Sequence, residues 1–258
     1  MMPRNEGGLI HLKILWMYQP SLLVALLCLA PRSLGKFAAI YAWLRVADDI
    51  VDAPLRNQAA VQTYIRDARE FLHTGHRAAD PPGLVAPPRA TRDKLDQILL
   101  KSWDPALKAV VGEMTEAVAW DAFRAPRVTE AELQAQCARI GRAYVRGIWH
   151  CIAGEPAPRI AEELGAAATV IHQLRDREED EGLGYINLPA ALGQPDLRRP
   201  EVRDWWLRRT EAAIHLLETS MLQGSWRARI LIHALCTRYA RKGRRLSADL
   251  RAAASGSR

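Results

Sequence analysis

Long apolar runs are missing from this chain of 258 residues: no uninterrupted apolar stretch reaches the roughly 20 residues that a helix needs to cross a bilayer. Residues 14–31, ILWMYQPSLLVALLCLAP, come closest, but Gln19, Pro20 and Ser21 interrupt them. The segment LLCLAPRS supplies neither a basic start nor a clear cleavage site, so it does not indicate a signal peptide. We interpret residues 14–31 as a core helix with a membrane-facing option, not as an anchor.

Cysteine is also scarce, and its spacing is uninformative for metals. The four cysteines, Cys28, Cys137, Cys151 and Cys236, form no CxxC pair and no zinc-type spacing. This pattern is typical of free buried thiols in a reducing compartment rather than of a disulfide framework. We therefore expect a cytoplasmic protein, with peripheral membrane contact as an option.

Lysine is rare beside arginine, 6 against 30, and the formal net charge is +7. Between Arg227 and Arg251 the chain carries eight basic residues against one acid, Asp249. We interpret this basic segment first as a solvated helix face, second as a surface that binds anionic lipid, and last as a surface that binds nucleic acid. We expect no nucleic-acid partner, because the arginines follow no recognition-helix pattern.

Alternating strand patterns and internal repeats are absent, whereas apolar residues recur with a helical period along the chain. The segment 77–92 has four prolines and a glycine and is predicted to be a loop. Thr129 followed by Glu132 predicts a capped helix start. Besides 14–31, helices are expected at 35–53, 58–74, 93–101, 105–123, 129–153, 157–181, 201–223 and 225–250. The prediction is one all-α domain of eight to ten helices over 1–250, built as a bundle around a central cavity, with a flexible tail at 251–258.

Acidic residues interrupt two otherwise apolar helical stretches. YAWLRVADDIVDAP contains Asp48 and Asp52, and HQLRDREEDEGLGYINLP contains Asp176 and Asp180. Residues four apart lie about 40° apart around a helix, so each pair presents two carboxylates on one face. One such pair is common on exposed helices, and REEDE alone is typical of a solvated charge run. Two pairs 128 residues apart, both beside an arginine, favour a shared function.

Paired carboxylates on two helices suit Mg²⁺, a hard cation that keeps several waters and shares its other positions with substrate phosphates. Arg45 and Arg175 would bind the remaining diphosphate oxygens through charge-assisted hydrogen bonds. Metal binding draws electron density from a leaving diphosphate. An allylic carbon–oxygen bond then breaks to a carbocation that an apolar cavity protects from water.

These motifs resemble the signatures of the squalene/phytoene synthase family. YAWLRVADDIVD is similar to YxxxRxxDDxxD, and RDREEDEGLGYINLP to RDxxxD followed by an aromatic-Leu-Pro segment; DAFRAPRVTEAELQAQC resembles the stretch between them. The resemblance implies an all-α isoprenoid synthase fold and Mg²⁺-dependent ionisation of a C15 or C20 prenyl diphosphate. Head-to-head joining to a second prenyl diphosphate would follow.

Carried over by position, the resemblance assigns roles to individual residues. Those that would bind Mg²⁺ are Asp48, Asp52, Asp176 and Asp180. Those that would contact diphosphate or steer the cation are Tyr41, Arg45 and Arg175.

Several family positions are occupied differently here. The Ser-Phe ahead of the first motif falls on Leu22-Leu23, the Tyr-Cys pair becomes Gln136-Cys137, the Gln and Asn before the second motif become Thr169 and His172, and the Arg and Tyr after it become Tyr185 and Asn187. These differences leave the aspartates intact and alter the surroundings that guide the second diphosphate.

Other residues near the motifs have more than one interpretation. His172, one turn before Asp176, is expected either to bind diphosphate or act as a base, or simply to bond its neighbours. Gln173 adjoins it and is a further candidate for substrate binding. Asp49 points about 100° from Asp48, which favours an ion pair over metal binding. The tryptophans that either stabilise a cation or form core are Trp43, Trp120 and Trp149.

Two other functions compete with coupling. A class I terpene cyclase would use one prenyl diphosphate on the same scaffold, and the altered second-substrate positions favour it. A degenerate, non-catalytic interaction protein would have eroded aspartates, yet all four are present. Substrate chain length, NADPH use and oligomeric state are open at this stage.

Overall fold

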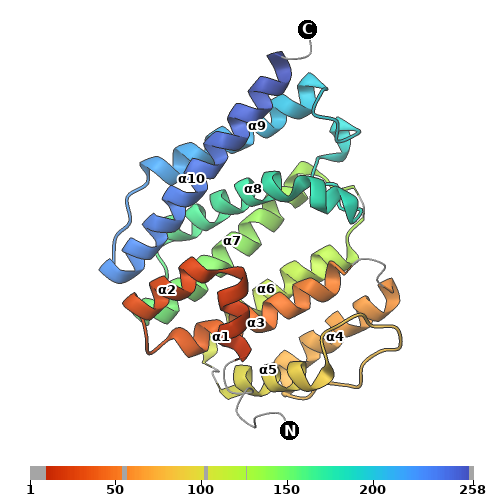
Figure 1. Cartoon of the computed structure of the whole chain (residues 1–258), viewed down its shortest axis with the longest axis vertical. Coiled ribbons are helices and arrows are strands. Elements are labelled where there is room, and N and C mark those ends of the chain that lie inside the picture. The colour runs from red at the N-terminus through yellow and green to blue at the C-terminus, as the bar shows by residue number, and fades with distance from the viewer. Residues whose placement is uncertain (1–9, 54–56, 102–103, 126, 256–258) are drawn as a thin grey trace. The chain divides into compact units, whose positions relative to one another are not determined.

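The computed structural model describes residues 10–53, 57–101, 104–125 and 127–255, and it is all-α, as predicted (Figure 1). These ranges hold no β-strand, only an isolated bridge between Val128 and Pro189. The helices are α1 (Ile10–Tyr18), α2 (Pro20–Leu29), α3 (Leu34–Val51), α4 (Gln58–Thr74), α5 (Arg89–Lys101), α6 (Pro105–Phe123), α7 (Glu130–Ala153), α8 (Arg159–Gly182), α9 (Pro200–Thr219) and α10 (Trp226–Ser255), with a 3-10 turn at Ala190–Leu192.

Some predicted boundaries were wrong. Residues 14–31 are two helices rather than one, because α1 ends at Tyr18 and Pro20 begins α2, where a missing N–H costs nothing. The predicted loop 77–92 ends early, since α5 starts at Arg89 directly after a proline. In addition, α10 continues to Ser255 through residues expected to be a tail, and α9 stops at Thr219.

The capping prediction at the start of α7 is confirmed. The backbone N–H of Thr129 donates to Glu132 Oε2 at 2.7 Å, and the N–H of Glu132 donates to Thr129 Oγ1 at 3.2 Å. This reciprocal pair satisfies two N–H groups that a helix start otherwise leaves unbonded.

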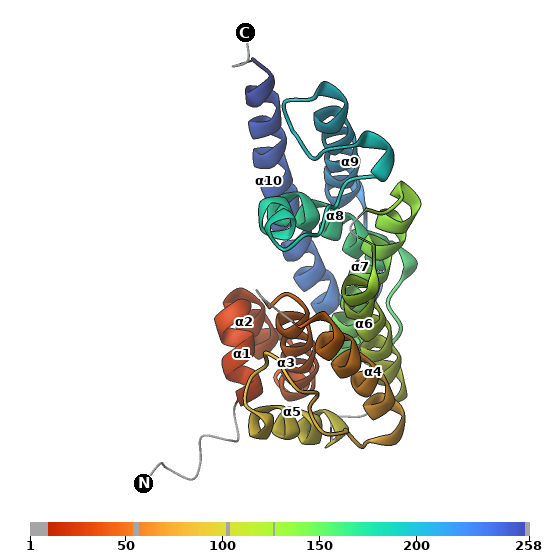
Figure 2. The same ribbon diagram turned by 90° about the vertical axis from the view of Figure 1, so that its right-hand side faces the viewer.

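The chain forms two compact units: residues up to Phe123 with Gly147–Pro156, and Arg124–Arg146 with Ala157–Arg258. The prediction of a single domain remains a prediction. In the first unit α3 packs against α1, α5 and α6, and α4 against α6 (Figure 2). Side chains are buried around most of the circumference of α3, which makes it the central helix of this unit.

A buried polar cluster fixes α3 to its neighbours. The Trp43 indole N–H donates to Asp96 Oδ1 at 2.7 Å, and Arg77 Nε donates to Asp96 Oδ2 at 2.8 Å. The side chains of Arg77 and Asp96 are only 6% and 9% exposed. Arg92 pairs with Asp80 in the same proline-rich segment. Because a buried charge is costly without partners, these bonds hold the segment against α3 and α5.

In the second unit α8, α9 and α10 pack together, and α7 approaches α8 closely at two glycines. A Cβ atom on Gly165 would lie 2.1 Å from the carbonyl oxygen of Gly141, and one on Gly141 would lie 2.2 Å from the carbonyl of Gly165. Only glycine permits this backbone contact, which fixes where α8 crosses α7.

Two of the three tryptophans singled out in the sequence and three of the four cysteines are buried. Trp43 and Trp149 are core residues, 3% and 0% exposed. All four cysteines are free, as predicted, but only three are buried, because Cys28 lies on the exposed face of α2. No helix among the described residues combines the length and apolarity needed to cross a membrane.

Candidate active site

The first aspartate motif occupies the end of α3. Asp48 lies in the last full turn, whereas Asp52 is the C-cap residue, and its N–H donates to the Asp48 carbonyl at 2.9 Å. Arg45 Nη1 donates to Asp48 Oδ2 at 3.0 Å, and Arg45 Nη2 lies 2.5 Å from Asp49 Oδ1. The ion pair expected for Asp49 is therefore present. Tyr41 is half-buried one turn earlier.

Spacing explains this arrangement. Residues three and four positions apart are neighbours on a helix surface, so Arg45 reaches both Asp48 and Asp49 from the preceding turn. The arginine thus balances part of the negative charge of three aspartates. Because all these side chains are partly exposed, the charges remain within reach of a ligand.

The second motif lies in the last third of α8, where His172 and Arg175 both contact Asp176. His172 Nδ1 is 2.6 Å from Asp176 Oδ2, and the Arg175 guanidinium faces both carboxylate oxygens. Burial opposes ionisation of Asp176, but the hydrogen bonds from His172 and Arg175 outweigh it and lower the pKa to about 2. Asp176 is therefore an ionised acceptor at neutral pH. His172 bonds its neighbours, as one of its two interpretations expected.

Asp180 is hydrogen-bonded to Asn187, which the sequence marked only as a departure from the family pattern, and Asn187 in turn is hydrogen-bonded to Arg124, which the sequence did not single out. Asn187 Nδ2 donates to Asp180 Oδ2 at 2.6 Å, and Arg124 Nη1 donates to Asn187 Oδ1 at 3.0 Å. The Arg124 guanidinium also lies over the Tyr185 ring, 4.7 Å from its centroid. Asn187 and Tyr185 are each 7% exposed. They occupy the positions where the family pattern has Arg and Tyr, and Arg124 supplies a guanidinium from elsewhere in the chain.

Gln173 lies on α8 beside His172. Its Oε1 atom is buried and accepts no hydrogen bond from the part of the chain that the structure describes. Such an acceptor costs free energy unless a donor reaches it. Gln173 therefore remains a candidate for binding a ligand.

Within the described ranges, the chemistry of the aspartate side chains, rather than a gathered set of ligands, is what the two motifs offer a divalent cation. Each motif offers two aspartates, and oxygen ligands are those that Mg²⁺ prefers. Among the described residues no group of three or more His, Cys, Asp or Glu side chains gathers in a metal-binding arrangement. The structure brings Arg45, Asp48 and Asp49 together in the first unit, and His172, Arg175 and Asp176 in the second.

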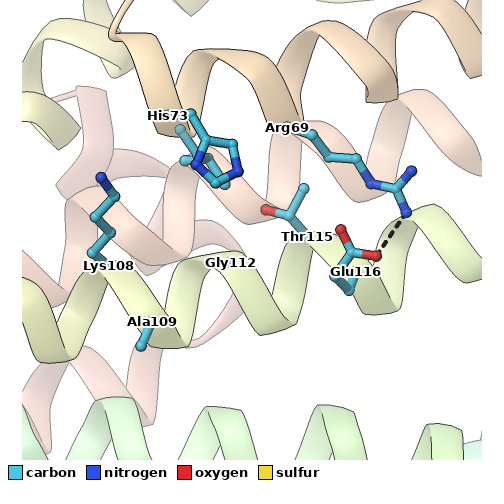
Figure 3. A pocket seen from close by; sticks show the side chains of 8 residues that line it. Arg69, His73, Lys108, Ala109, Gly112, Thr115 and Glu116 are labelled. Atoms are coloured by element: carbon cyan, nitrogen blue, oxygen red, sulfur yellow. Dashed lines mark hydrogen bonds and ion pairs between the residues drawn. The ribbon is translucent and has the colours of Figure 1, made fainter.

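A separate cavity lies in the first unit between α4 and α6 (Figure 3). Its volume is about 360 Å³, and an ion pair between Arg69 Nη2 and Glu116 Oε2, 2.7 Å long, lies beside it. His73 and Lys108 also line it. None of its lining residues belongs to either aspartate motif, so this cavity is not the candidate substrate site.

Comparison with known proteins places these motifs in context. A model of the squalene/phytoene synthase family matches residues 18–254. The chain belongs to this family. Within the family, it is 31% identical over 160 residues to a presqualene diphosphate synthase of Rhodopseudomonas palustris, a match that covers 59% of this chain and 52% of the relative. The chain therefore matches about half the length of that curated relative.

The fold agrees with a solved structure. A crystal structure of a dehydrosqualene synthase in complex with ligand superposes with a TM-score of 0.64 at 18% identity, covering 94% of each chain. This synthase shares the all-α isoprenoid synthase fold predicted from the two motifs.

Proposed function

We propose that this family member ionises a C15 or C20 prenyl diphosphate with Mg²⁺ and joins it head to head to a second prenyl diphosphate. One observation carries the proposal: each helix presents an aspartate pair at a family signature, with an arginine already ion-paired to it. A solvated run of charged residues would not explain why an arginine is ion-paired with an aspartate in both motifs. Family membership supports the reaction class.

The residues divide into two groups by role. Mg²⁺ would be held by Asp48, Asp52, Asp176 and Asp180, and when bound it would withdraw electron density from the leaving diphosphate. Arg45 and Arg175 are ion-paired with aspartates of the two motifs. With Mg²⁺ held by the aspartates, the guanidinium groups of Arg45 and Arg175 would donate hydrogen bonds to diphosphate oxygens.

His172, Gln173 and Tyr41 complete the proposed surroundings. His172 fixes the orientation of the Asp176 carboxylate through their 2.6 Å contact. The buried Oε1 of Gln173 is available to accept a bond from a ligand or its water. Tyr41 lies one turn before Arg45, and the face of its ring would stabilise a nearby carbocation.

Coupling rather than cyclisation is favoured by the relative named presqualene diphosphate synthase, since that name denotes a product that keeps a diphosphate. In the proposed step a C–O bond breaks and one diphosphate leaves. The double bond of the second substrate forms a C–C bond with the cation, and a proton is lost. Products must therefore be sought both as diphosphates and as hydrocarbons.

The test is diphosphate release from C10, C15 and C20 prenyl diphosphates with and without Mg²⁺, with mass spectrometry of the products. Asp48→Ala and Asp176→Ala should each lower the rate about a hundredfold or more, because each removes a charged cation ligand. Glu178→Ala is the matched control: this acid lies two residues from Asp176 but is 86% exposed, and it should leave the rate unchanged.

The outcomes separate the competing functions. A C30 or C40 product supports the proposal, with one diphosphate released per coupling if the product keeps a diphosphate and two if it is a hydrocarbon. A cyclic C15 or C20 product made from a single substrate assigns the chain to the terpene cyclases instead. If no substrate releases diphosphate, the assignment as an enzyme is wrong and the interaction protein takes its place.

A further inference from the structure

The start of α10 carries an exposed apolar surface that the proposed reaction does not use. Met221, in the connection from α9, is 87% exposed, and Trp226 and Ile230 are 60% and 52% exposed. Trp226 and Ile230 are four residues apart, so they lie about 40° apart on one face of the helix. We call Met221, Trp226, Arg227, Arg229 and Ile230 the α10 patch.

The packing of α9 against α10 explains why this surface is uncovered. The ion pairs Arg251–Glu211 and Arg244–Glu218 set an antiparallel register, in which the end of α9 faces the middle of α10. The first half of α10 therefore extends beyond the end of α9 (Figure 1). Its other face, which includes Leu231 and Ile232, is buried and holds the helix on the protein.

Positive charge surrounds the exposed apolar side chains. Arg227 and Arg229 are both exposed, and the Arg227 guanidinium lies over the Trp226 ring, 5.4 Å from its centroid. Within the described residues Arg229 forms no ion pair with a carboxylate. The first turn of α10 contains no acidic residue, so the partial positive charge of the helix start adds to that of the arginines.

We propose that the α10 patch docks on the surface of an anionic lipid bilayer. Tryptophan prefers the boundary between headgroups and acyl chains, and methionine and isoleucine would insert beside it. The arginines would remain at the level of the lipid phosphates, which their planar guanidinium groups bind well. An apolar surface alone could bind several kinds of partner. The positive charge of the arginines favours an anionic membrane among them.

Other occupants fit the patch less well. A second copy of the chain packed about a two-fold axis would bring the same arginines together, and like charges across an interface oppose binding. A nucleic acid would pair with the arginines but leave three large apolar side chains against phosphates. Both are outcomes of the test below.

The experiment measures sedimentation of the full chain with vesicles of phosphatidylcholine containing about 30% phosphatidylglycerol, compared with phosphatidylcholine alone. No substrate is present, so the result is independent of the proposed reaction. The combined variant Met221→Ser, Trp226→Ser and Ile230→Ser should bind at least about tenfold more weakly. Arg227→Gln with Arg229→Gln should weaken binding roughly fivefold per arginine, and added salt should mimic that loss.

The matched control replaces three exposed apolar side chains in the first unit, as the α10 triple variant does in the second. Trp16, Met17 and Leu27 are also exposed, and the combined variant Trp16→Ser, Met17→Ser and Leu27→Ser should bind vesicles like the wild type. Because the substituted side chains are exposed in both triple variants, their melting temperatures should stay close to that of the wild type.

Several results would overturn the proposal. These are no binding to anionic vesicles, or loss of binding in the control triple while the α10 variants bind normally. A dimer that the α10 triple variant dissociates would assign the patch to a second copy. Binding to a DNA duplex that depends on the arginines alone would assign it to nucleic acid.

Discussion

Replacing Asn187 with alanine tests whether Asp180 depends on residues outside its motif. Asn187 donates to Asp180 at 2.6 Å and accepts from Arg124 at 3.0 Å, and it is almost fully buried. Its amide has one orientation that satisfies both partners, with the NH2 group toward the carboxylate and the oxygen toward the guanidinium. Alanine at this position would remove both hydrogen bonds at once.

The magnitude follows from the charges of the partners. A hydrogen bond to a charged group contributes about 1.5–3 kcal/mol, but Asp180 and Arg124 are partly exposed, so water replaces some of that contribution. We expect Asn187→Ala to lower the free energy of unfolding by about 2 kcal/mol, a fall of about 4–8 °C in Tm for a chain of this size. Loss of the Asn187 donor should also raise the Mg²⁺ concentration needed for half-maximal activity about 10- to 100-fold, because this amide orients the Asp180 carboxylate.

Thermal melting and a Mg²⁺ titration of diphosphate release measure the two effects. Thr210→Val is the control, because the buried Thr210 hydroxyl in the same unit makes no hydrogen bond to any described residue and its loss should not change the Mg²⁺ requirement. In a double-mutant cycle with Arg124→Met, we expect a coupling of about 1 kcal/mol in stability. The reasoning is refuted if Asn187→Ala melts within about 1 °C of the wild type and keeps its Mg²⁺ requirement.

Three further predictions concern the scaffold. Gly165→Ala forces a Cβ atom against the α7 backbone and should lower stability in urea unfolding by about 3 kcal/mol, whereas Gly112→Ala, with no atom within 4 Å, should raise it by about 0.5–1 kcal/mol. Burial raises the pKa of the Cys151 thiol to about 12, so iodoacetamide at mildly alkaline pH should alkylate exposed Cys28 but reach Cys151 only in urea, as mass spectrometry would show; equal labelling of both would contradict this. Asp96→Ala removes the acceptor that the buried Arg77 guanidinium and the Trp43 indole share. It should lower the free energy of unfolding by about 3–5 kcal/mol in the same urea assay, and a loss below about 1 kcal/mol would mean that the ion pair is not stabilising.

Much of the fold could be predicted because helix periodicity and breakers act locally. Pro105, for example, gives α6 the start expected at 105, and the Thr129 capping pair marks the start of α7. Boundaries set by tertiary contacts were less accessible. The extension of α10 to Ser255 accompanies the ion pair of Arg251 with Glu211, which comes from another helix and leaves no local pattern.

In the candidate site, too, contacts within one helix could be predicted from the sequence, whereas contacts between distant segments could not. Asp48 and Asp49 could be assigned different partners because their directions follow from the helix period, and the Asp49 ion pair is present. Arg124 could not be found in this way, since it lies 56 residues before Asp180 and Asn187 links the two side chains. Asn187 was visible only as a departure from the family pattern, without the contact that explains it.

The departures at Tyr185 and Asn187 acquire a physical meaning once Arg124 is considered. An arginine directly after the second motif would place a guanidinium beside Asp180, and here Arg124 brings that group in from the segment before α7, stacked on Tyr185. Asn187 then transmits the contact, donating to the aspartate on one side and accepting from the arginine on the other. Asp180 thus accepts a hydrogen bond from a neutral amide, and Asp48 and Asp176 each contact an arginine directly. Because the Asn187 amide is neutral, its hydrogen bond to Asp180 competes less strongly with an incoming cation than a guanidinium in the same position would.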